Sequence, residues 1–241
     1  MPSVEQAILL CGGLGTRLRA LYSDRPKALV PVHGKPFIEY VIDGLIRQNV
    51  KHIHIAAGYR ADQIKAWAEK QTHQNVHVTV SIEPASLGTA GGLKFTETFI
   101  DTGKPILVMN GDSLLMNTSF DEMIARLQNH PEWVAVLAAV EMTERGQFGT
   151  VEIDEQMNVT AFREKAERSG GWVNGGIYLM RREIFSMIPG DRSVSIETEI
   201  FPQLAGARRL GALKTQGPLL DMGTPEGLER TENFLAGKPI A

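Results

Sequence analysis

The sequence lacks the features that mark several large classes of protein. Its 241 residues include one cysteine, Cys11, so an internal disulfide is impossible. The longest apolar run, residues 133–140, is much too short to span a bilayer, and no basic segment precedes the first apolar stretch as it would in a signal peptide. The net charge is -3, from 25 basic and 28 acidic residues, which argues against a nucleic-acid binder. We therefore expect a cytoplasmic protein that binds neither nucleic acid nor membrane.

Several motifs of catalysis and cofactor binding are also absent. The six histidines are scattered without a zinc-ligand pattern, and no G-x-S-x-G segment marks a nucleophilic serine. No segment fits the P-loop pattern G-x-x-x-x-G-K-[ST]. Leu18 stands where a dinucleotide-binding fingerprint after Gly13 and Gly15 requires a third glycine. These absences disfavour a zinc enzyme, a serine hydrolase and an NAD-dependent enzyme.

The order of apolar and amphipathic segments indicates an α/β protein. Up to about residue 140, short apolar runs that fit buried strands alternate with helical patterns, as in βαβ units. After residue 140, turns separate the apolar runs, which predicts antiparallel strands. The expected strands are 7–11, 53–55, 76–82, 106–109, 133–140, 150–153, 159–162, 173–180 and 219–221. The expected helices are 38–46, 64–67, 89–99, 119–127 and 225–235.

One expected strand has a distinctive pattern. His52 and His54 alternate with Ile53 and Ile55. Because successive side chains of a strand point to opposite faces, this alternation predicts that both histidines lie on the more polar face.

A glycine-rich loop follows the first expected strand. Glycines at positions 12, 13 and 15 let backbone N–H groups approach phosphate oxygens, because no Cβ intervenes. Arg17 adds a guanidinium suited to phosphate, and Lys27 lies between Pro26 and Pro31, which restrict the backbone around it. Taken alone, each feature also fits a tight turn or a solvated lysine.

Two aspartates follow expected strands far apart in the sequence. Asp112 lies in the segment Asn110-Gly111-Asp112, and Asp221 ends the strand 219–221. In an open α/β sheet the carboxyl ends of the strands line the ligand crevice, and carboxylates there can hold Mg²⁺ together with substrate phosphates. Either aspartate alone also fits a residue that caps a turn.

In order along the chain, these segments resemble the signature of the sugar-1-phosphate nucleotidylyltransferases. The sequence reads G-G-L-G-T-R-L at 12–18 and P-K-A-L-V-P-V at 26–32, where the family pattern is G-G-x-G-[ST]-R-L followed by P-K-[PA]-x-x-P-[VI]. Further matches are E-P-A-S-L-G-T-A-G at 83–91, F-G-T-V at 148–151, F-R-E-K at 162–165, V-N-G-G-I-Y at 173–178 and D-M-G-T-P at 221–225. Ala28 and Ala166 stand where many members have proline.

The resemblance implies a Rossmann-like, three-layer α/β nucleotidyltransferase fold with a mixed, mostly parallel central sheet. It implies a single domain over 1–241, in which about 1–140 binds the nucleotide and about 141–241 binds the sugar phosphate. The activity would be transfer of a nucleoside monophosphate to a sugar 1-phosphate, with release of pyrophosphate. Arg17, Lys27 and Asp112 would be catalytic, and Asp112 with Asp221 would hold Mg²⁺.

The resemblance also assigns binding residues at both ends of the pocket. The nucleotide would contact Leu10, Gly12, Gly13, Gly15, Thr16, Glu83, Leu87, Gly88 and Thr89. The sugar phosphate would contact Gly149, Glu164, Lys165, Asn174, Gly175 and Glu197.

Glu83 points to a guanine nucleotide. The Watson–Crick edge of guanine has two adjacent donors, N1–H and the N2 amino group, and an ionised carboxylate can accept from both. Uracil and thymine have one donor between two acceptors, which suits an amide better. The sequence therefore favours GTP, although Glu83 also fits a solvated residue or a turn cap.

Within the family, the chain most resembles the short bacterial D-glycero-α-D-manno-heptose 1-phosphate guanylyltransferases. The support is Glu83 before L-G-T-A-G, the segment 174–178, and a length that leaves no room for the C-terminal β-helix of many mannose-1-phosphate enzymes. Transfer to mannose 1-phosphate, uridylyl transfer to another hexose 1-phosphate and a non-catalytic sugar-nucleotide sensor remain alternatives. The sequence leaves open whether the protein is a monomer or a homodimer.

Overall fold

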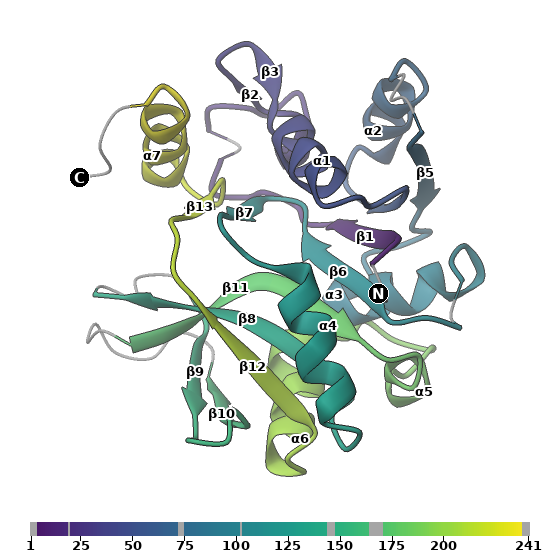
Figure 1. Ribbon diagram of the computed structural model, residues 1–241. Coiled ribbons are helices and arrows are strands. Elements are labelled where there is room, and N and C mark those ends of the chain that lie inside the picture. The colour runs from purple at the N-terminus through teal and green to yellow at the C-terminus, as the bar shows by residue number, and fades with distance from the viewer. Residues whose placement is uncertain are drawn as a thin grey trace.

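A nine-stranded mixed sheet runs through the middle of the molecule (Figure 1). The computed structural model describes residues 4–18, 20–71, 75–101, 103–143, 148–163 and 171–237. The strands are β1 Gln6–Cys11, β2 Pro31–Val32, β3 Lys35–Pro36, β4 His52–Ala57, β5 His77–Ile82, β6 Ile106–Asn110, β7 Ser113–Leu115, β8 Ala135–Met142, β9 Thr150–Ile153, β10 Val159–Arg163, β11 Gly171–Met180, β12 Leu210–Thr215 and β13 Leu219–Asp221. The helices are α1 Phe37–Arg47, α2 Ala61–Ala68, α3 Gly88–Phe95, α4 Phe120–Asn129, α5 Ile184–Met187, α6 Phe201–Gly206 and α7 Pro225–Leu235, with short helical turns at Lys27–Leu29, Thr96–Thr98 and Ile196–Ile200.

The sheet has a parallel part and an antiparallel part. Strands β6, β1, β4 and β5 are parallel neighbours in that order. Strand β11 then runs antiparallel to β6 and to β8, and β9 and β10 extend the antiparallel part, while β12 lies parallel to β8. The expected α/β class with a mixed sheet is confirmed, as are the antiparallel strands after residue 140.

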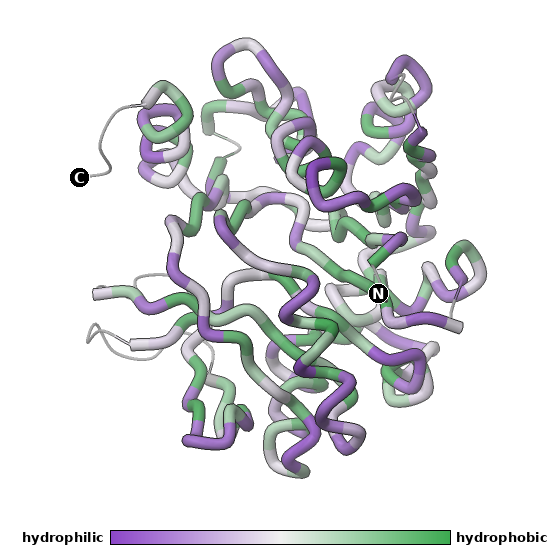
Figure 2. Tube along the Cα trace, in the orientation of Figure 1, coloured by the Kyte–Doolittle hydropathy of each residue, from purple (hydrophilic) through white to green (hydrophobic). Residues whose placement is uncertain are grey.

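Two hydrophobic cores cover the two faces of the sheet. Successive residues of β6 alternate between them: Leu107 and Met109 pack with α1 and α4, whereas Ile106 and Val108 pack with α3, α5 and α6. Hydrophobic residues follow the central strands, and hydrophilic residues gather toward the outer turns and loops (Figure 2). The result is three layers, with helices on both faces of one sheet. In the part of the chain that the structure describes, no helix is both long and apolar enough to cross a membrane.

The structure also contains elements that the sequence analysis did not predict. Strands β7 and β12 have weak sequence signals, because β7 has three residues and β12 contains Gly211 and Lys214. The expected helix 89–99 is divided into α3 and the short helical turn Thr96–Thr98.

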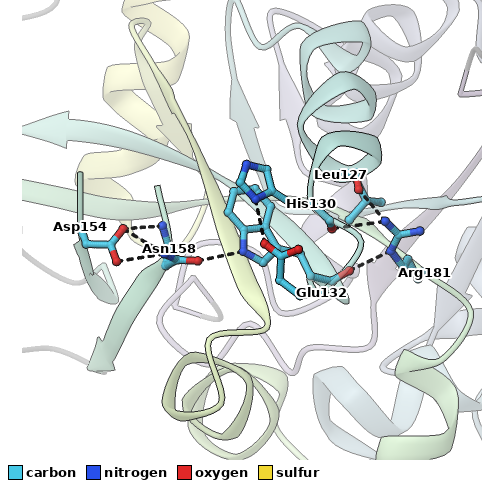
Figure 3. A network of polar contacts seen from close by, with 7 residues as sticks. Leu127, His130, Glu132, Asp154, Asn158 and Arg181 are labelled. Carbon is cyan, nitrogen blue, oxygen red and sulfur yellow. Dashed lines mark hydrogen bonds and ion pairs between the residues drawn. The ribbon is translucent and has the colours of Figure 1, made fainter. Parts of the chain in front are cut away.

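A polar network joins the segment before β8 to the turn between β9 and β10, to α4 and to the end of β11 (Figure 3). The Trp133 indole N–H donates to Asn158 Oδ1 at 2.9 Å, and Asn158 Nδ2 donates to Asp154. The guanidinium of Arg181, just after β11, donates to the carbonyls of Leu127 and Trp133. Because a Cβ on Gly211 would lie 2.2 Å from the Trp133 ring, β12 can pair beside it only with glycine there.

Both histidines lie on the polar face of β4, as expected, but they differ in exposure. His52 is exposed, but His54 is 3% exposed, stacks on Phe99 and has both ring nitrogens in hydrogen bonds, to Thr79 and Ser81. The face is polar, yet β5 and Phe99 cover it. Burial lowers the pKa of His54 to about 4, so the ring is neutral at physiological pH.

This buried ring predicts a pH-dependent stability. The pKa of His54 is lower in the folded chain than the ordinary 6.5, so the unfolded chain binds the extra proton between pH 6.5 and about 4. The stability that the neutral ring contributes is present above pH 6.5 and is lost as pH falls toward 4. We expect urea unfolding of His54→Gln to give a flatter free-energy profile across this window than the wild type.

His52→Gln, at the exposed position, is the matched control and should keep the wild-type slope. A His54→Gln profile parallel to the wild type would contradict the prediction.

Candidate active site

Two short strands bring together the aspartates that lie far apart in the sequence. Strand β7 directly follows Asp112 and pairs antiparallel with β13, so that Ser113 lies opposite Asp221. The Met222 N–H also donates to the Asp112 carbonyl at 2.8 Å. Backbone hydrogen bonds therefore hold the two acids next to each other.

Cationic side chains flank the two acids. Lys27 Nζ lies 2.7 Å from Asp112 Oδ2, and its side chain is 16% exposed. Burial and then the nearby charge of Asp112 raise the pKa of Asp221 to about 6, while Lys27 and Arg17 act in the opposite direction. Lys27 thus lies within electrostatic range of both carboxylates, and Arg17 within range of Asp221.

Six of the nine predicted nucleotide residues line one cavity. Its volume is about 190 Å³, and it lies between the glycine loop after β1, the end of β5 and the start of α3. Its lining includes the predicted residues Leu10, Gly12, Gly13, Glu83, Gly88, Thr89 and Asp112, together with Leu14, Ser86 and Asn110. Gly15 has φ +59 and packs toward Lys27, while Leu87 donates its backbone N–H to Glu83. Gly15, Thr16 and Leu87 are outside this lining.

Two glycines make room for the Glu83 carboxylate. A Cβ at Gly12 would lie 2.8 Å from Glu83 Oε1, and one at Gly92 would lie 2.6 Å from the same atom. The Leu87 N–H donates to Oε2 at 3.4 Å, and burial raises the pKa of Glu83. Glu83 is therefore a partly buried acid of the cavity wall rather than a fully solvated side chain. Gly92 was not predicted, although it belongs to the same glycine-rich segment.

A second cavity adjoins the first. It measures about 210 Å³, and the two linings share Asn110 and Asp112. The predicted residues in it are Arg17, Lys27, Asp112, Asn174 and Asp221. Sequence reasoning missed the remaining lining residues Asn110, Ser113, Phe148, Gly176, Leu219 and Gly223, each of which lies one or two positions from a residue it did select.

The other predicted sugar-phosphate residues lie outside this lining. The Gly149 carbonyl accepts from the Asn174 N–H at 2.8 Å, so it supports a lining residue. Gly175 packs into β7, since a Cβ there would lie 2.4 Å from Leu115 Cδ2. Glu164 and Lys165 lie outside the described residues.

Glu197 connects the sugar half to the nucleotide half. Its Oε2 accepts from Thr89 Oγ1 at 2.6 Å and from Ser195 Oγ at 3.1 Å, and burial raises its pKa. It lies in the π-helical turn Ile196–Ile200, an irregularity that is frequent at functional sites. The neighbouring Val194 carbonyl accepts from the Ala90 N–H, so this segment also holds the start of α3.

Comparison with known proteins identifies the family. A family model described as nucleotidyl transferase matches residues 6–238. The chain belongs to the nucleotidyl transferase family. It is 34% identical to the D-glycero-alpha-D-manno-heptose 1-phosphate guanylyltransferase of Campylobacter jejuni, over 92% of this chain and 96% of that protein. It is 31% identical to the catalytic subunit beta of mannose-1-phosphate guanylyltransferase from Xenopus tropicalis, over 96% of this chain and 63% of that protein.

A solved structure agrees with this assignment. The crystal structure of HddC from Yersinia pseudotuberculosis complexed with GMP-PN matches this nucleotidyl transferase with a TM-score of 0.83 at 28% identity, over 96% of this chain and 100% of the other. The likeness confirms the expected nucleotidyltransferase fold.

The acidic pair of this nucleotidyl transferase fits a divalent cation. Carboxylate oxygens are hard ligands, and two of them with substrate phosphates make a usual Mg²⁺ site. Burial, and then the charge of Asp112, raise the pKa of Asp221 by more than Lys27 and Arg17 lower it. A cation held by Asp112 and Asp221 would supply the missing positive charge and polarise a bound phosphate.

We predict that Asp221 lowers the stability of the metal-free protein and is required for Mg²⁺ to stabilise it. The pKa of Asp221 is raised in the folded chain, so its ionisation costs stability as pH rises from 3.8 to about 6 and the cost persists at pH 7.5. We expect Asp221→Asn to raise the Tm of metal-free protein by roughly 2–5 °C. The variant should lose the further rise that Mg²⁺ gives the wild type, because only a bound cation stabilises the folded state.

Thermal unfolding with EDTA and with a Mg²⁺ series measures both effects. Glu229→Gln, on the exposed side of α7, is the control and should leave Tm and the Mg²⁺ response unchanged. A lower metal-free Tm, or an intact Mg²⁺ response in Asp221→Asn, would count against the site.

Proposed function

We propose that the protein transfers GMP from GTP to D-glycero-α-D-manno-heptose 1-phosphate, using Mg²⁺ and releasing pyrophosphate. The observation that carries the proposal is the pair of adjoining cavities that share Asn110 and Asp112. A two-substrate transfer requires two binding volumes that meet at the reacting phosphate. Asp112, paired with Lys27, lies at that junction, and Asp221 lies in the wall of the second cavity.

The chemistry of the transfer suits these side chains. An ionised oxygen of the sugar 1-phosphate attacks the α-phosphorus, the new P–O bond forms, and the bond to the β-phosphate breaks. Because the nucleophile is already ionised, positioning and charge neutralisation supply most of the catalysis. We assign Arg17 and Lys27 to the triphosphate and the leaving pyrophosphate, and Asp112 with Asp221 to Mg²⁺. Lys165 is assigned to the sugar phosphate by its place in the sequence.

Support for GTP comes from Glu83 and from the relatives. The Glu83 carboxylate lies in the wall of the first cavity, where it can accept from both donors of a guanine edge. The relatives with high coverage are named as guanylyltransferases, and the HddC structure was solved with GMP-PN. The proposal therefore assigns Glu83 to the base.

Support for the heptose comes from the extent of the match. The heptose enzyme of Campylobacter jejuni is covered over 96% of its length, and the mannose enzyme of Xenopus tropicalis over 63%. Mannose 1-phosphate is the second candidate, since heptose and mannose share the stereochemistry of the ring.

Pyrophosphate release tests the proposal. Purified protein with Mg²⁺ is given GTP, UTP, dTTP, CTP or ATP against heptose, mannose, glucose and N-acetylated 1-phosphates. Release with GTP and heptose 1-phosphate is the expected result. Release only with GTP and mannose 1-phosphate would keep the reaction but make mannose 1-phosphate the acceptor. Binding of a GDP-sugar without any release would favour a non-catalytic sensor.

A substitution at the base end gives a sharper prediction. We expect Glu83→Gln to lower kcat/KM for GTP relative to UTP by roughly 10- to 100-fold, because an amide presents a donor to a guanine edge that needs two acceptors. Glu97→Gln, on the turn after α3 and paired with Lys94, is the control and should leave the preference unchanged. An unaltered GTP/UTP ratio in Glu83→Gln would remove Glu83 from base selection.

A further inference from the structure

Asn110 has a buried oxygen at the junction of the two cavities. It is the last residue of β6, and with Asp112 it is shared by both cavity linings. Its Oδ1 is buried and accepts no hydrogen bond from any residue that the structure describes. Buried amide oxygens in folded proteins nearly always have a donor, so this atom is a place where a ligand group can supply one.

The surrounding network fixes the direction of this oxygen. Asn110 Nδ2 faces the backbone of Gly176, where a Cβ would lie 3.2 Å away, and the Asn110 side chain lies close enough to the buried Tyr178 hydroxyl to lower its pKa against the larger effect of burial. Asn174 Nδ2 donates to the same hydroxyl at 2.8 Å, and Asn174 Oδ1 accepts from the Gly176 N–H.

A break in the strand register makes this arrangement possible. The pairing of β11 with β8 shifts between Asn174 and Tyr178, and Gly176 within that stretch has φ +74. A Cβ at position 176 would lie 2.7 Å from Ser113 Oγ, so only glycine fits there. The shift places Asn110, Asn174 and Tyr178 in one rigid group and turns the donor side of the Asn110 amide toward β11.

The chemistry of the two substrates limits what can reach Oδ1. Phosphate oxygens are acceptors and cannot pair with an amide oxygen. The donor on a sugar 1-phosphate nearest its phosphate is the 2-hydroxyl, on the carbon next to the anomeric carbon. Asn110 and Asn174 both lie beside the Tyr178 hydroxyl, and Asn174 lines the second cavity alone, so the sugar side supplies the fitting donor.

We propose that Asn110 Oδ1 accepts a hydrogen bond from the 2-hydroxyl of the sugar 1-phosphate and thereby selects sugars that carry it. This assignment rests on the proposed transfer reaction. Asn110 is then a specificity-determining residue that touches substrate, and Tyr178 is a positioning residue that acts through it.

A double-mutant-type cycle, in which both the sugar and residue 110 are changed, tests the proposal. Wild type and Asn110→Ala are each given heptose 1-phosphate and its 2-deoxy analogue with GTP and saturating Mg²⁺. We expect wild type to lose roughly 10-fold in kcat/KM on the deoxy sugar, because the amide oxygen is then left unpaired. Asn110→Ala should lose a similar factor on the parent sugar and show a parent-to-deoxy ratio near one.

Two further variants separate this role from a structural one. Thr118 also has a buried oxygen without a partner among the described residues, but it lies outside both linings, so Thr118→Ala should keep the wild-type ratio. Tyr178→Phe keeps the Asn110 oxygen but removes its support, so it should reduce the ratio without abolishing it. If Asn110→Ala does not fold, Tyr178→Phe carries the test.

The outcomes distinguish this proposal from the function on which it rests. If another sugar 1-phosphate is the substrate, the heptose assignment fails and the cycle is run with that sugar and its 2-deoxy analogue. If the protein binds sugar phosphates without turnover, the two dissociation constants replace kcat/KM. A parent-to-deoxy ratio in Asn110→Ala equal to that of the wild type overturns the proposal. If that unchanged ratio comes with a higher Mg²⁺ requirement, the oxygen accepts from metal-bound water instead.

Discussion

The arrangement of the site depends on one constraint, which is that two carboxylates of like charge must be held side by side in partly buried surroundings. Their mutual repulsion and desolvation oppose this placement, as the raised pKa of Asp221 shows. Main-chain bonds, rather than side-chain attraction, overcome it: β7 pairs with β13, and the Met222 N–H donates to the Asp112 carbonyl. Lys27 then compensates part of the charge, and substrate with a cation can supply the remainder.

The parallel and antiparallel parts of the sheet line different cavities around this pair of aspartates. The parallel strands β1 and β5 end at the glycine loop and at Glu83, which form the first cavity. The antiparallel strand β11 runs beside β6 and presents Asn174 and Gly176 to the second cavity. Strand β6 lies between these parts, and both cavities share its last residue, Asn110, and Asp112 just after it. A transfer between two substrates needs such a common wall, because the reacting atoms must meet there.

Sequence reasoning selected residues that the structure places in the cavity walls, but it did not foresee the contacts that bring them together. Asp112, Asp221, Lys27 and Glu83 stand in motifs whose residue types follow from local chemistry, and each lies in a cavity wall. The pairing that joins the aspartates depends on β7, which is too short to have a periodic pattern. The contact between Asn110 and Tyr178 likewise depends on a register shift in β11. That shift is a feature of how β11 pairs with β8 and β6 in the assembled sheet, so no local sequence pattern reveals it. Burial of His54 depends on Phe99, which comes from a different segment.

The pattern of carboxyl pKa values locates the site without reference to any motif. Among the described residues, pairing lowers the pKa of several partly exposed acids, such as Glu5 beside Lys104 and Glu199 beside Arg192. Burial raises it for Glu83, Glu197 and Asp221, and these three surround the two cavities or contact Thr89 in their wall. Burying an acid without a matching cation destabilises a fold unless a ligand later supplies the charge or the donors. The concentration of that cost at one place therefore argues, independently of the sequence signature, that the place binds cations and polar substrates.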